Sequence, residues 1–311
     1  MLAIVCPGQG SQKPGMLSDW LELDGVREDL SVDAQLAGLD LIVHGTESGE
    51  DAVRDTAVAQ PLIVAASLIS AKALGLTAHQ LGERPERVLI AGHSVGEIAA
   101  AAIAGTITRE DAFRLISVRG SAMAEASAAE PTGMAAVLGG KEDEVLAALE
   151  QAGLSPANVN GGGQIVAAGS EQAITALTEN PPARARVMPL KVAGAFHTSY
   201  MAPAKDKLAE AAEQVRAEDP ALPLLSNRDG QQAIAGADVI SRIVDQVTRP
   251  VRWDLCMETM KDRGITGILE LAPGGTLAGL AKRGLKGVPS FAVTSPEDLT
   301  AAQDFIAEHT A

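Results

Sequence analysis

The sequence has few aromatic residues, few cysteines and few positive charges. Only 2% of its 311 residues are aromatic, so a core must be built mainly from aliphatic side chains. The two cysteines, Cys6 and Cys256, stand far apart and lack C-x-x-C spacing. This spacing argues against a zinc site or a disulfide framework and favours a reducing cytoplasm. We therefore expect no metal site and a cytoplasmic protein.

We also expect neither a membrane-spanning apolar run nor an export signal. Charged residues or glycine interrupt each apolar stretch before it reaches the thickness of a bilayer, so no membrane partner is expected. The chain begins with the strand-like run Leu2–Cys6 and not with a basic region and a cleavage site. The formal net charge of -15 disfavours a nucleic-acid partner, because phosphate binding needs a concentrated cationic surface.

What is present predicts an α/β protein with an insertion. Residues 1 to about 125 alternate short apolar runs with helical stretches, which is typical of a mainly parallel sheet. We expect strands at residues 2–6 and 88–91. We expect helices at residues 62–74, with Pro61 in the first turn, and at 95–103 and 109–125.

From about residue 128 to 195 the pattern changes. Strand-like and helical segments follow in the order βαββαβ, the ferredoxin-like split motif, at residues 134–138, 142–151, 157–159, 164–168, 171–178 and 186–192. The prediction is therefore a large α/β domain formed by residues 1–127 and 196–311, with a ferredoxin-like subdomain inserted at 128–195. In the last part we expect helices at 203–216, 238–247 and 254–263, a strand at 267–271 and a final helix.

The sharpest chemical motif is Gly92-His93-Ser94-Val95-Gly96, a G-x-S-x-G between a buried strand and a helix. This context is the one that a nucleophile elbow requires, in which a strained turn presents the serine hydroxyl above the sheet. The flanking glycines leave room where the strand and the helix nearly touch. The alternative is a glycine-bounded turn with an incidental serine.

A serine nucleophile needs a base, and the sequence offers five histidines. His309 in the tail and His79 in a polar turn are expected at the surface, and His44 is expected to be structural. His93 stands beside the serine, where packing or pocket lining suits it better than proton transfer. His197 lies in a small-residue loop where the insertion rejoins the main domain, a place where clefts form. The residues alone leave it open between a base and a structural histidine.

Two further features bear on the site. The loop Pro7–Gln12 lacks the G-K-[ST] ending of a phosphate loop, and Lys13 replaces the last glycine of G-x-G-x-x-G. The loop is therefore either a tight turn or a source of a main-chain N–H for an oxyanion. Arg119 is either a solvated edge residue or, if it faces a cleft, a bidentate partner for a carboxylate.

Five segments together resemble the malonyl-CoA:acyl carrier protein transacylases, in the order and spacing of that family. The likeness is greatest to the discrete bacterial fatty-acid enzymes of high-GC Gram-positives. It rests on Pro7-Gly8-Gln9-Gly10-Ser11-Gln12, Gly92-His93-Ser94-Val95-Gly96-Glu97, Arg119-Gly120, Ala195-Phe196-His197 and Gln246-Val247-Thr248-Arg249-Pro250-Val251-Arg252-Trp253. The resemblance implies a hydrolase-like large domain with a ferredoxin-like insert.

The resemblance also implies a catalytic apparatus. It makes Ser94 the nucleophile and His197 its base, and it assigns the oxyanion hole to the main-chain N–H groups of Gln9 and Val95. Gln246 would orient the histidine through its main-chain carbonyl, in place of the acid of a triad.

The implied substrate contacts come from other positions. Arg119 would bind the free carboxylate of malonate, and Phe196 is similar to the form that favours malonyl over methylmalonyl. His93 and Asn160 are further candidates for lining the cleft.

The implied activity is transfer of malonyl from malonyl-CoA to the phosphopantetheine thiol of an acyl carrier protein for fatty acid synthesis. No cofactor is expected, and nothing demands an oligomer. Since carrier proteins are acidic, docking needs a local basic patch, with candidates at Arg184, Arg186, Lys191, Lys282, Arg283 and Lys286. The alternatives are a polyketide synthase acyltransferase acting in trans, the transacylase of a malonate decarboxylase, a serine thioesterase or esterase, and a nucleotide-binding module.

Overall fold

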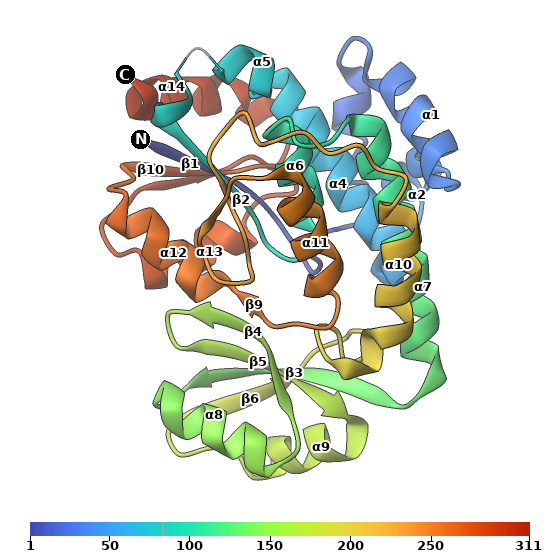
Figure 1. Ribbon diagram of the computed structural model, residues 1–311, viewed down its shortest axis with the longest axis vertical. Helices are drawn as coiled ribbons and strands as arrows, with labels where there is room; N and C mark the ends of the chain where they lie inside the picture. The colour runs from blue at the N-terminus through green and yellow to red at the C-terminus, as the bar shows by residue number, and fades with distance from the viewer. Residues whose placement is uncertain (83) are drawn as a thin grey trace.

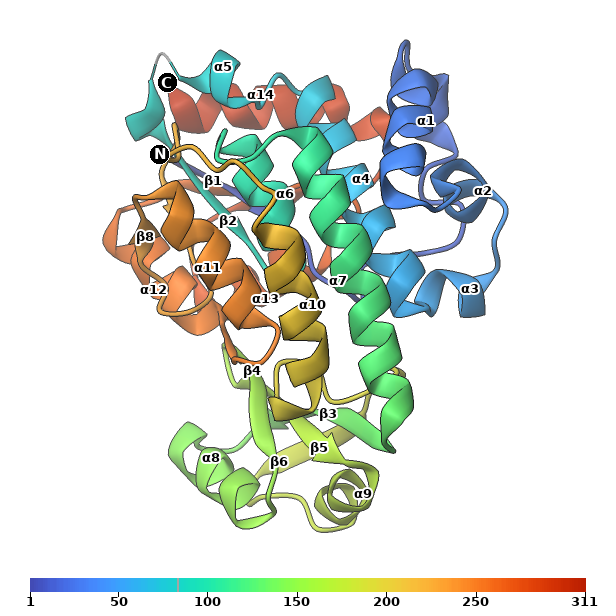
Figure 2. The ribbon, with the colours of Figure 1, turned by 45° about the vertical axis from the view of Figure 1, so that its right-hand side comes forward.

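The computed structural model describes residues 1–82 and 84–311 of the chain. It shows an α/β fold with two mixed sheets, a larger one near both chain termini and a smaller one at the opposite end of the molecule (Figure 1). Helices α7 (Arg109–Ala129) and α10 (Ala202–Ala212) run side by side from the small sheet into the larger unit (Figure 2).

The larger sheet has six strands in the order β11-β10-β1-β2-β7-β8. These are β1 (Leu2–Cys6), β2 (Val88–Gly92), β7 (Leu224–Leu225), β8 (Gln232–Ala233), β10 (Gly267–Glu270) and β11 (Ser290–Ala292). All neighbouring pairs are parallel except β7 and β8. Side chains alternate along β1, so that Leu2, Ile4 and Cys6 enter one core while Ala3 and Val5 enter another.

Helices cover both faces of this sheet. The core on the Leu2 face includes residues from α1 (Val26–Ala37), α2 (Leu41–Thr46), α3 (Glu50–Arg54), α4 (Thr56–Ala73), α6 (Gly96–Ile103), α7, α10, α11 (Gly236–Gln246) and α14 (Leu299–Thr310). Helices α12 (Trp253–Asp262) and α13 (Thr276–Gly284) pack on the opposite face. Apart from the smaller sheet and its two helices, the other elements are α5 (Ala78–Leu81) and the short 3-10 helices at Asp19–Glu22, Pro85–Arg87, Ser199–Met201 and Pro296–Asp298.

Helix α4 is the central helix of the larger core. Every residue from Val58 to Ala71 is buried, which explains why the helix is apolar on all sides. The segment Thr56–Leu81 is long and apolar enough to cross a membrane by length and composition, so the expectation that no run reaches this length is wrong. Because 72% of its most apolar window is buried inside the protein, it fits a core helix.

The predicted start of α4 at Pro61 is also wrong. The helix begins at Thr56, where the Asp55 side chain accepts a hydrogen bond from the main-chain N–H of Ala57. This cap stabilises the first turn and places Pro61 inside the helix.

The smaller sheet has the strand order β6-β3-β5-β4-β9. Its strands are β3 (Thr132–Gly139), β4 (Ser155–Gly161), β5 (Gln164–Ser170), β6 (Ala185–Pro189) and β9 (Val251–Arg252), and its helices are α8 (Glu142–Gln151) and α9 (Glu171–Glu179). Side chains of α8 and α9 share a core with one face of the sheet. The other face presents Met134, Val166 and Ala168 to the core of the larger unit.

Most predicted elements are confirmed, including the helix at 142–151. The helix after Pro273–Gly275 is not the last one, because β11 and α14 follow it. His79 is exposed as predicted, but the prediction of a surface position for His309 is wrong. The Nδ1 atom of His309 lies 3.0 Å from the Thr266 hydroxyl, and its ring packs 4.3 Å from the ring centroid of Phe305.

Candidate active site

Ser94 occupies a sharp turn between β2 and α6. Its φ of 54° lies in the left-handed region that non-glycine residues rarely adopt. The side-chain oxygen of Asn227 holds the turn by accepting a hydrogen bond from the Ser94 main-chain N–H at 2.8 Å. The turn therefore has the strained strand-to-helix geometry that the G-x-S-x-G motif predicts.

Both glycines of the motif are required because neighbouring backbone approaches them too closely for a side chain. A Cβ atom built on Gly92 would lie 2.0 Å from the carbonyl carbon of Gly96. A Cβ atom on Gly96 would lie 2.3 Å from the carbonyl oxygen of Cys6 and 2.7 Å from that of Pro7. Strand β1, the elbow turn and helix α6 thus meet backbone to backbone.

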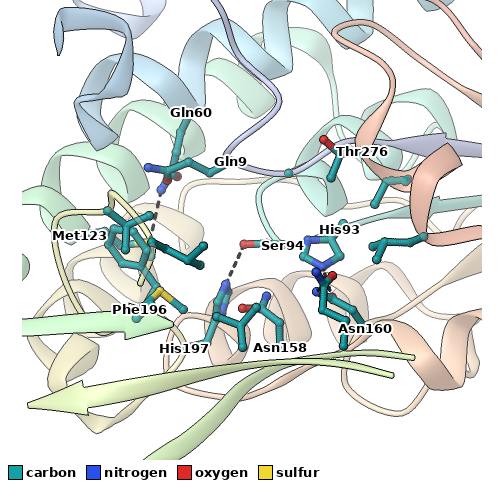
Figure 3. A pocket seen from close by; sticks show the side chains of 18 residues that line it. Gln9, Gln60, His93, Ser94, Met123, Asn158, Asn160, Phe196, His197 and Thr276 are labelled. Atoms are coloured by element: carbon teal, nitrogen blue, oxygen red, sulfur yellow. Dashed lines mark hydrogen bonds between the residues drawn. The ribbon is translucent and has the colours of Figure 1, made fainter. Parts of the chain in front are cut away.

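The hydroxyl of Ser94 meets the ring of His197 across the pocket (Figure 3). The Ser94 Oγ and His197 Nε2 atoms are 2.8 Å apart, although the two residues are distant along the chain. The other ring nitrogen, Nδ1, lies 2.8 Å from the main-chain oxygen of Gln246. Because that carbonyl can only accept, the ring proton sits on Nδ1, and Nε2 is left to accept from the serine hydroxyl.

The environment keeps His197 neutral. Burial, and then the nearby charge of Arg119, lower the pKa of His197 to about 3. A neutral imidazole that accepts from a serine hydroxyl has the protonation state of a general base.

Arg119 points into the site from α7 and is buried. Its Nη1 atom donates to Gln60 Oε1 at 2.6 Å, and its Nη2 atom donates to Gln246 Oε1 at 2.9 Å and to Ser94 Oγ at 3.3 Å. Burial lowers the pKa of Arg119 to about 10, so the group stays positively charged near neutral pH.

The surroundings of this cation suit an anionic ligand. All three acceptors are neutral, so within residues 1–82 and 84–311 no carboxylate pairs directly with the guanidinium, and Nε has no partner there. A buried cation beside the serine, held only by neutral groups, can bind a carboxylate.

The pocket around Ser94 lies between the two sheets and contains about 770 Å³ of empty space, part of which is open solvent. Its apolar wall consists of Met123, Met134, Val166, Leu190, Val192, Phe196, Leu277 and Leu280. Figure 3 shows the ring of Phe196 beside Met123 on the histidine side of the pocket. Phe196 is thus placed where it can limit the size of a bound ligand.

His93 and Asn160 lie together on the opposite side (Figure 3). The His93 Nε2 and Asn160 Oδ1 atoms are 2.9 Å apart, and the Asn160 amide donates to Gln164 Oε1 at 3.1 Å. The His93 ring also packs edge-on against Trp253, with centroids 5.6 Å apart. Both side chains line the pocket, and the His93 imidazole contacts Asn160, whereas the ring in contact with the Ser94 hydroxyl is that of His197.

Main-chain donors lie on two sides of the serine. Within the described ranges, the N–H groups of Gln9 and Val95 donate to no protein acceptor. Gln9 follows β1 and lines the pocket, and Val95 precedes the first turn of α6. The two N–H groups are thus available to a ligand.

Three residues of the site were missed from the sequence. Asn227 holds the elbow, Gln60 holds Arg119, and the carboxylate of Glu97 accepts from both Asn227 and Gln246. One signal was available for Gln60, which is a polar residue beside the apolar run of residues 61–66 in a largely apolar helix. A second was available for Asn227, which follows a short buried strand.

The described residues contain no group of three or more histidine, cysteine, aspartate or glutamate side chains that could hold a metal ion. Cys6 and Cys256 are both buried and free.

Comparison with known proteins gives consistent matches over nearly the whole chain. Residues 3–306 match the family described as acyl transferase domain. The chain is 53% identical over 299 residues to the malonyl CoA-acyl carrier protein transacylase of Mycobacterium tuberculosis, covering 96% of this chain and 98% of that protein.

Solved structures agree with this. The crystal structure of MCAT from Mycobacterium tuberculosis has a TM-score of 0.92 and 52% identity, covering 97% of this chain and 99% of the other. A structure described as PlMCAT:AntF (holo), a type II PKS acyl-carrier protein in complex with its malonyl-transacylase, has a TM-score of 0.88 and 31% identity, covering 98% and 99%.

The close approach at Gly96 generates a stability prediction. Gly96→Ala should lower the free energy of unfolding by about 3 kcal/mol, because the new methyl group meets fixed backbone on β1. Gly279→Ala in α13 is the matched control, since a Cβ there meets nothing within 4 Å and alanine favours a helix. Urea unfolding measures both, and equal stability of the two variants would contradict the proposed close packing of the elbow.

Proposed function

The chain belongs to the acyl transferase family, among the malonyl CoA-acyl carrier protein transacylases, and from that premise we propose how its site works. The enzyme transfers malonyl from malonyl-CoA to the phosphopantetheine thiol of an acyl carrier protein, through a malonyl ester on a serine. The main support for this proposal is the 2.8 Å contact between Ser94 Oγ and His197 Nε2, next to the buried side chain of Arg119.

The first half-reaction forms the ester. His197 Nε2 takes the hydroxyl proton as the Ser94 oxygen attacks the thioester carbon. The carbonyl oxygen becomes an oxyanion, to which the main-chain N–H groups of Gln9 and Val95 donate. The intermediate collapses, the carbon–sulfur bond breaks, and the proton on His197 passes to the departing coenzyme A sulfur.

The second half-reaction runs the same steps with a different thiol. The phosphopantetheine thiol gives its proton to His197 and attacks the carbonyl carbon of the malonyl ester. The bond from that carbon to the Ser94 oxygen then breaks, and His197 returns the proton to the serine oxygen. Gln246 serves both halves, because its carbonyl fixes the proton on His197 Nδ1 and so keeps Nε2 free. The apolar wall around Phe196 restricts access of water to the ester.

Arg119 supplies acyl selectivity in this proposal. The free carboxylate of a malonyl group can accept from the guanidinium in the bidentate geometry that arginine favours. An acetyl group would leave the buried cation with neutral acceptors only, which costs binding energy. Phe196 narrows the space beside it, which favours malonyl over methylmalonyl.

The finer description of the fold is also a proposal. We assign a hydrolase-like large domain to residues 1–127 and 196–311 and a ferredoxin-like insert to residues 128–195. Support comes from the order β3-α8-β4-β5-α9-β6, the strand order β6-β3-β5-β4 and the packing of both helices on one face. Strand β9 adds a fifth strand to the insert from outside its range.

The setting follows from the assignment. We propose that the enzyme acts in fatty acid synthesis in the cytoplasm, without a cofactor and as a monomer, and that an acyl carrier protein is its partner. The candidate cations for docking are all exposed: Arg184, Arg186, Lys191, Lys282, Arg283 and Lys286. The alternative within the family is an enzyme that supplies a polyketide synthase. The similar structure of a malonyl-transacylase with a type II PKS acyl-carrier protein is compatible with this alternative.

Intact-protein mass spectrometry tests the assignment. After brief exposure to malonyl-CoA, the wild-type chain should gain the mass of one malonyl group, and the adduct should disappear when holo carrier protein is added. Ser94→Ala should gain nothing, because the ester oxygen is missing. Rapid release of free malonate without a persisting adduct would instead indicate a thioesterase.

Arg119→Ala tests the selectivity. Leaving the malonyl carboxylate unpaired in a buried site costs about 3 kcal/mol, so kcat/KM for malonyl-CoA should fall on the order of a hundredfold. Acetyl transfer should change much less. Arg114→Ala is the control, because Arg114 lies on the same helix with its side chain exposed. Equal losses for both donors would refute the carboxylate-binding role.

A further inference from the structure

Glu97 is a buried carboxylate to which the reaction just described gives no part. It is the second residue of α6 and is 5% exposed. Its Oε1 atom accepts from the main-chain N–H of Asn227 at 2.5 Å, and its Oε2 atom accepts from the side-chain amide of Gln246. Both oxygens are therefore occupied by donors.

The two partners of Glu97 hold the rest of the site. Asn227 accepts from the Ser94 N–H at 2.8 Å and donates to the carbonyl oxygen of Gly92 at 2.7 Å. Gln246 accepts from Arg119 through its side chain and from His197 through its main chain. Glu97 thus touches no reacting atom. It is connected to the serine through Asn227, and to the histidine and the arginine through Gln246.

The side-chain amide of Gln246 can satisfy its neighbours in only one orientation. An amide has an accepting end and a donating end, and a guanidinium can only donate. The oxygen of Gln246 must therefore face Arg119, and its NH₂ group must face Glu97. That NH₂ group donates to Glu97 Oε2 and, at 3.2 Å, to the side-chain oxygen of Asn227. Since Oε1 of Glu97 accepts from the Asn227 main-chain N–H, both carboxylate oxygens face donors, which suits the ionised form.

We propose that Glu97 is a positioning residue for acyl-group selection. Its ionised carboxylate orients the Gln246 amide, and the amide in turn holds the Arg119 guanidinium ready for the carboxylate of the acyl group. This inference rests on the proposed function, since it concerns how the same site distinguishes a malonyl from an acetyl group.

The charged and titratable groups around Glu97 affect its pKa. Arg119 faces it from α7, Arg242 faces it from α11, and the thiol of Cys256 faces it from α12. Arg242 is itself paired with Asp229 and Asp238.

Burial raises the pKa of Glu97 to about 7, against the opposing effect of Asn227 and the two arginines. Between pH 6 and pH 8 the low pKa of His197, about 3, keeps the imidazole neutral, and the pKa of Arg119, about 10, keeps the guanidinium charged. Glu97 therefore gains a proton as the pH falls through this range. Because each of its oxygens faces an N–H donor, the added proton occupies one of the two accepting positions and weakens the hold on the Gln246 amide or on Asn227.

Glu97→Gln isolates this effect. If the new amide keeps its oxygen toward Asn227, its NH₂ group faces the NH₂ group of Gln246, and the Gln246 amide must turn over. Its NH₂ group would then face Arg119, which is also a donor. The ratio of kcat/KM for malonyl-CoA to that for acetyl-CoA should fall roughly 10- to 100-fold.

The double variant Glu97→Gln/Gln246→Glu separates positioning from stability. A carboxylate at position 246 accepts from the amide at position 97 and from Arg119, and the main-chain oxygen that holds His197 is unchanged. The melting temperature should recover toward that of the wild type. The malonyl-to-acetyl ratio should stay low, because a protein carboxylate now neutralises Arg119.

The control and the pH profile complete the test. Glu270→Gln alters another buried carboxylate, one that accepts from main-chain N–H groups of α13, and it should lower the melting temperature without changing the ratio. In the wild type the ratio should fall between pH 8 and pH 6, whereas in Glu97→Gln it should be low and flat.

The inference would be overturned if Glu97→Gln kept the malonyl-to-acetyl ratio and the pH profile of the wild type. It would also be overturned if kcat/KM fell equally for malonyl-CoA and acetyl-CoA while the melting temperature dropped. In either case the wild-type chain would still form its malonyl ester on Ser94. Absence of that ester in the wild type would instead overturn the proposed function, and this inference with it.

Discussion

The site depends on a histidine that is held by a peptide carbonyl and not by a carboxylate. The carbonyl of Gln246 fixes the proton on Nδ1 of His197, and the opposite nitrogen faces the Ser94 hydroxyl at 2.8 Å. A carboxylate in that position would favour the charged imidazolium, whereas burial and Arg119 disfavour it. The arrangement therefore keeps a neutral base beside a buried cation, and it leaves that cation free of a competing protein anion.

The carboxylate of Glu97 is separated from Arg119 by the side-chain amide of Gln246. Glu97 balances the charge of the guanidinium across this amide without occupying the space of a ligand. One glutamine thus joins His197, through its main chain, to the buried guanidinium of Arg119, through its side chain. The serine belongs to the same network, because Asn227 joins Glu97 to the elbow. In the proposed mechanism, chemistry and selectivity therefore depend on the same few buried hydrogen bonds.

Sequence patterns predicted those parts of the fold and of the site that depend on contacts between residues close together in the sequence. The elbow around Ser94 was predictable because close backbone contact demands glycine on both sides. The pairing of the serine with His197 was not decided by spacing, since it depends on how the insert returns to the main domain. Asn227 and Gln60 act through contacts with distant residues. His309 was misplaced because its burial depends on α14 covering Thr266 at the sheet edge, and Pro61 was misplaced because the cap at Asp55 outweighs a proline signal.

The protonation of His197 tests the account most directly. Nitrogen-15 NMR of the selectively labelled histidine ring distinguishes the two tautomers and the imidazolium, with the denatured chain as the control. The account predicts a proton on Nδ1, none on Nε2, and no titration between pH 8 and pH 5, because the pKa is lowered to about 3. A proton on Nε2, or an imidazolium that forms by pH 6, would contradict it, since the ring could not then accept the proton of Ser94.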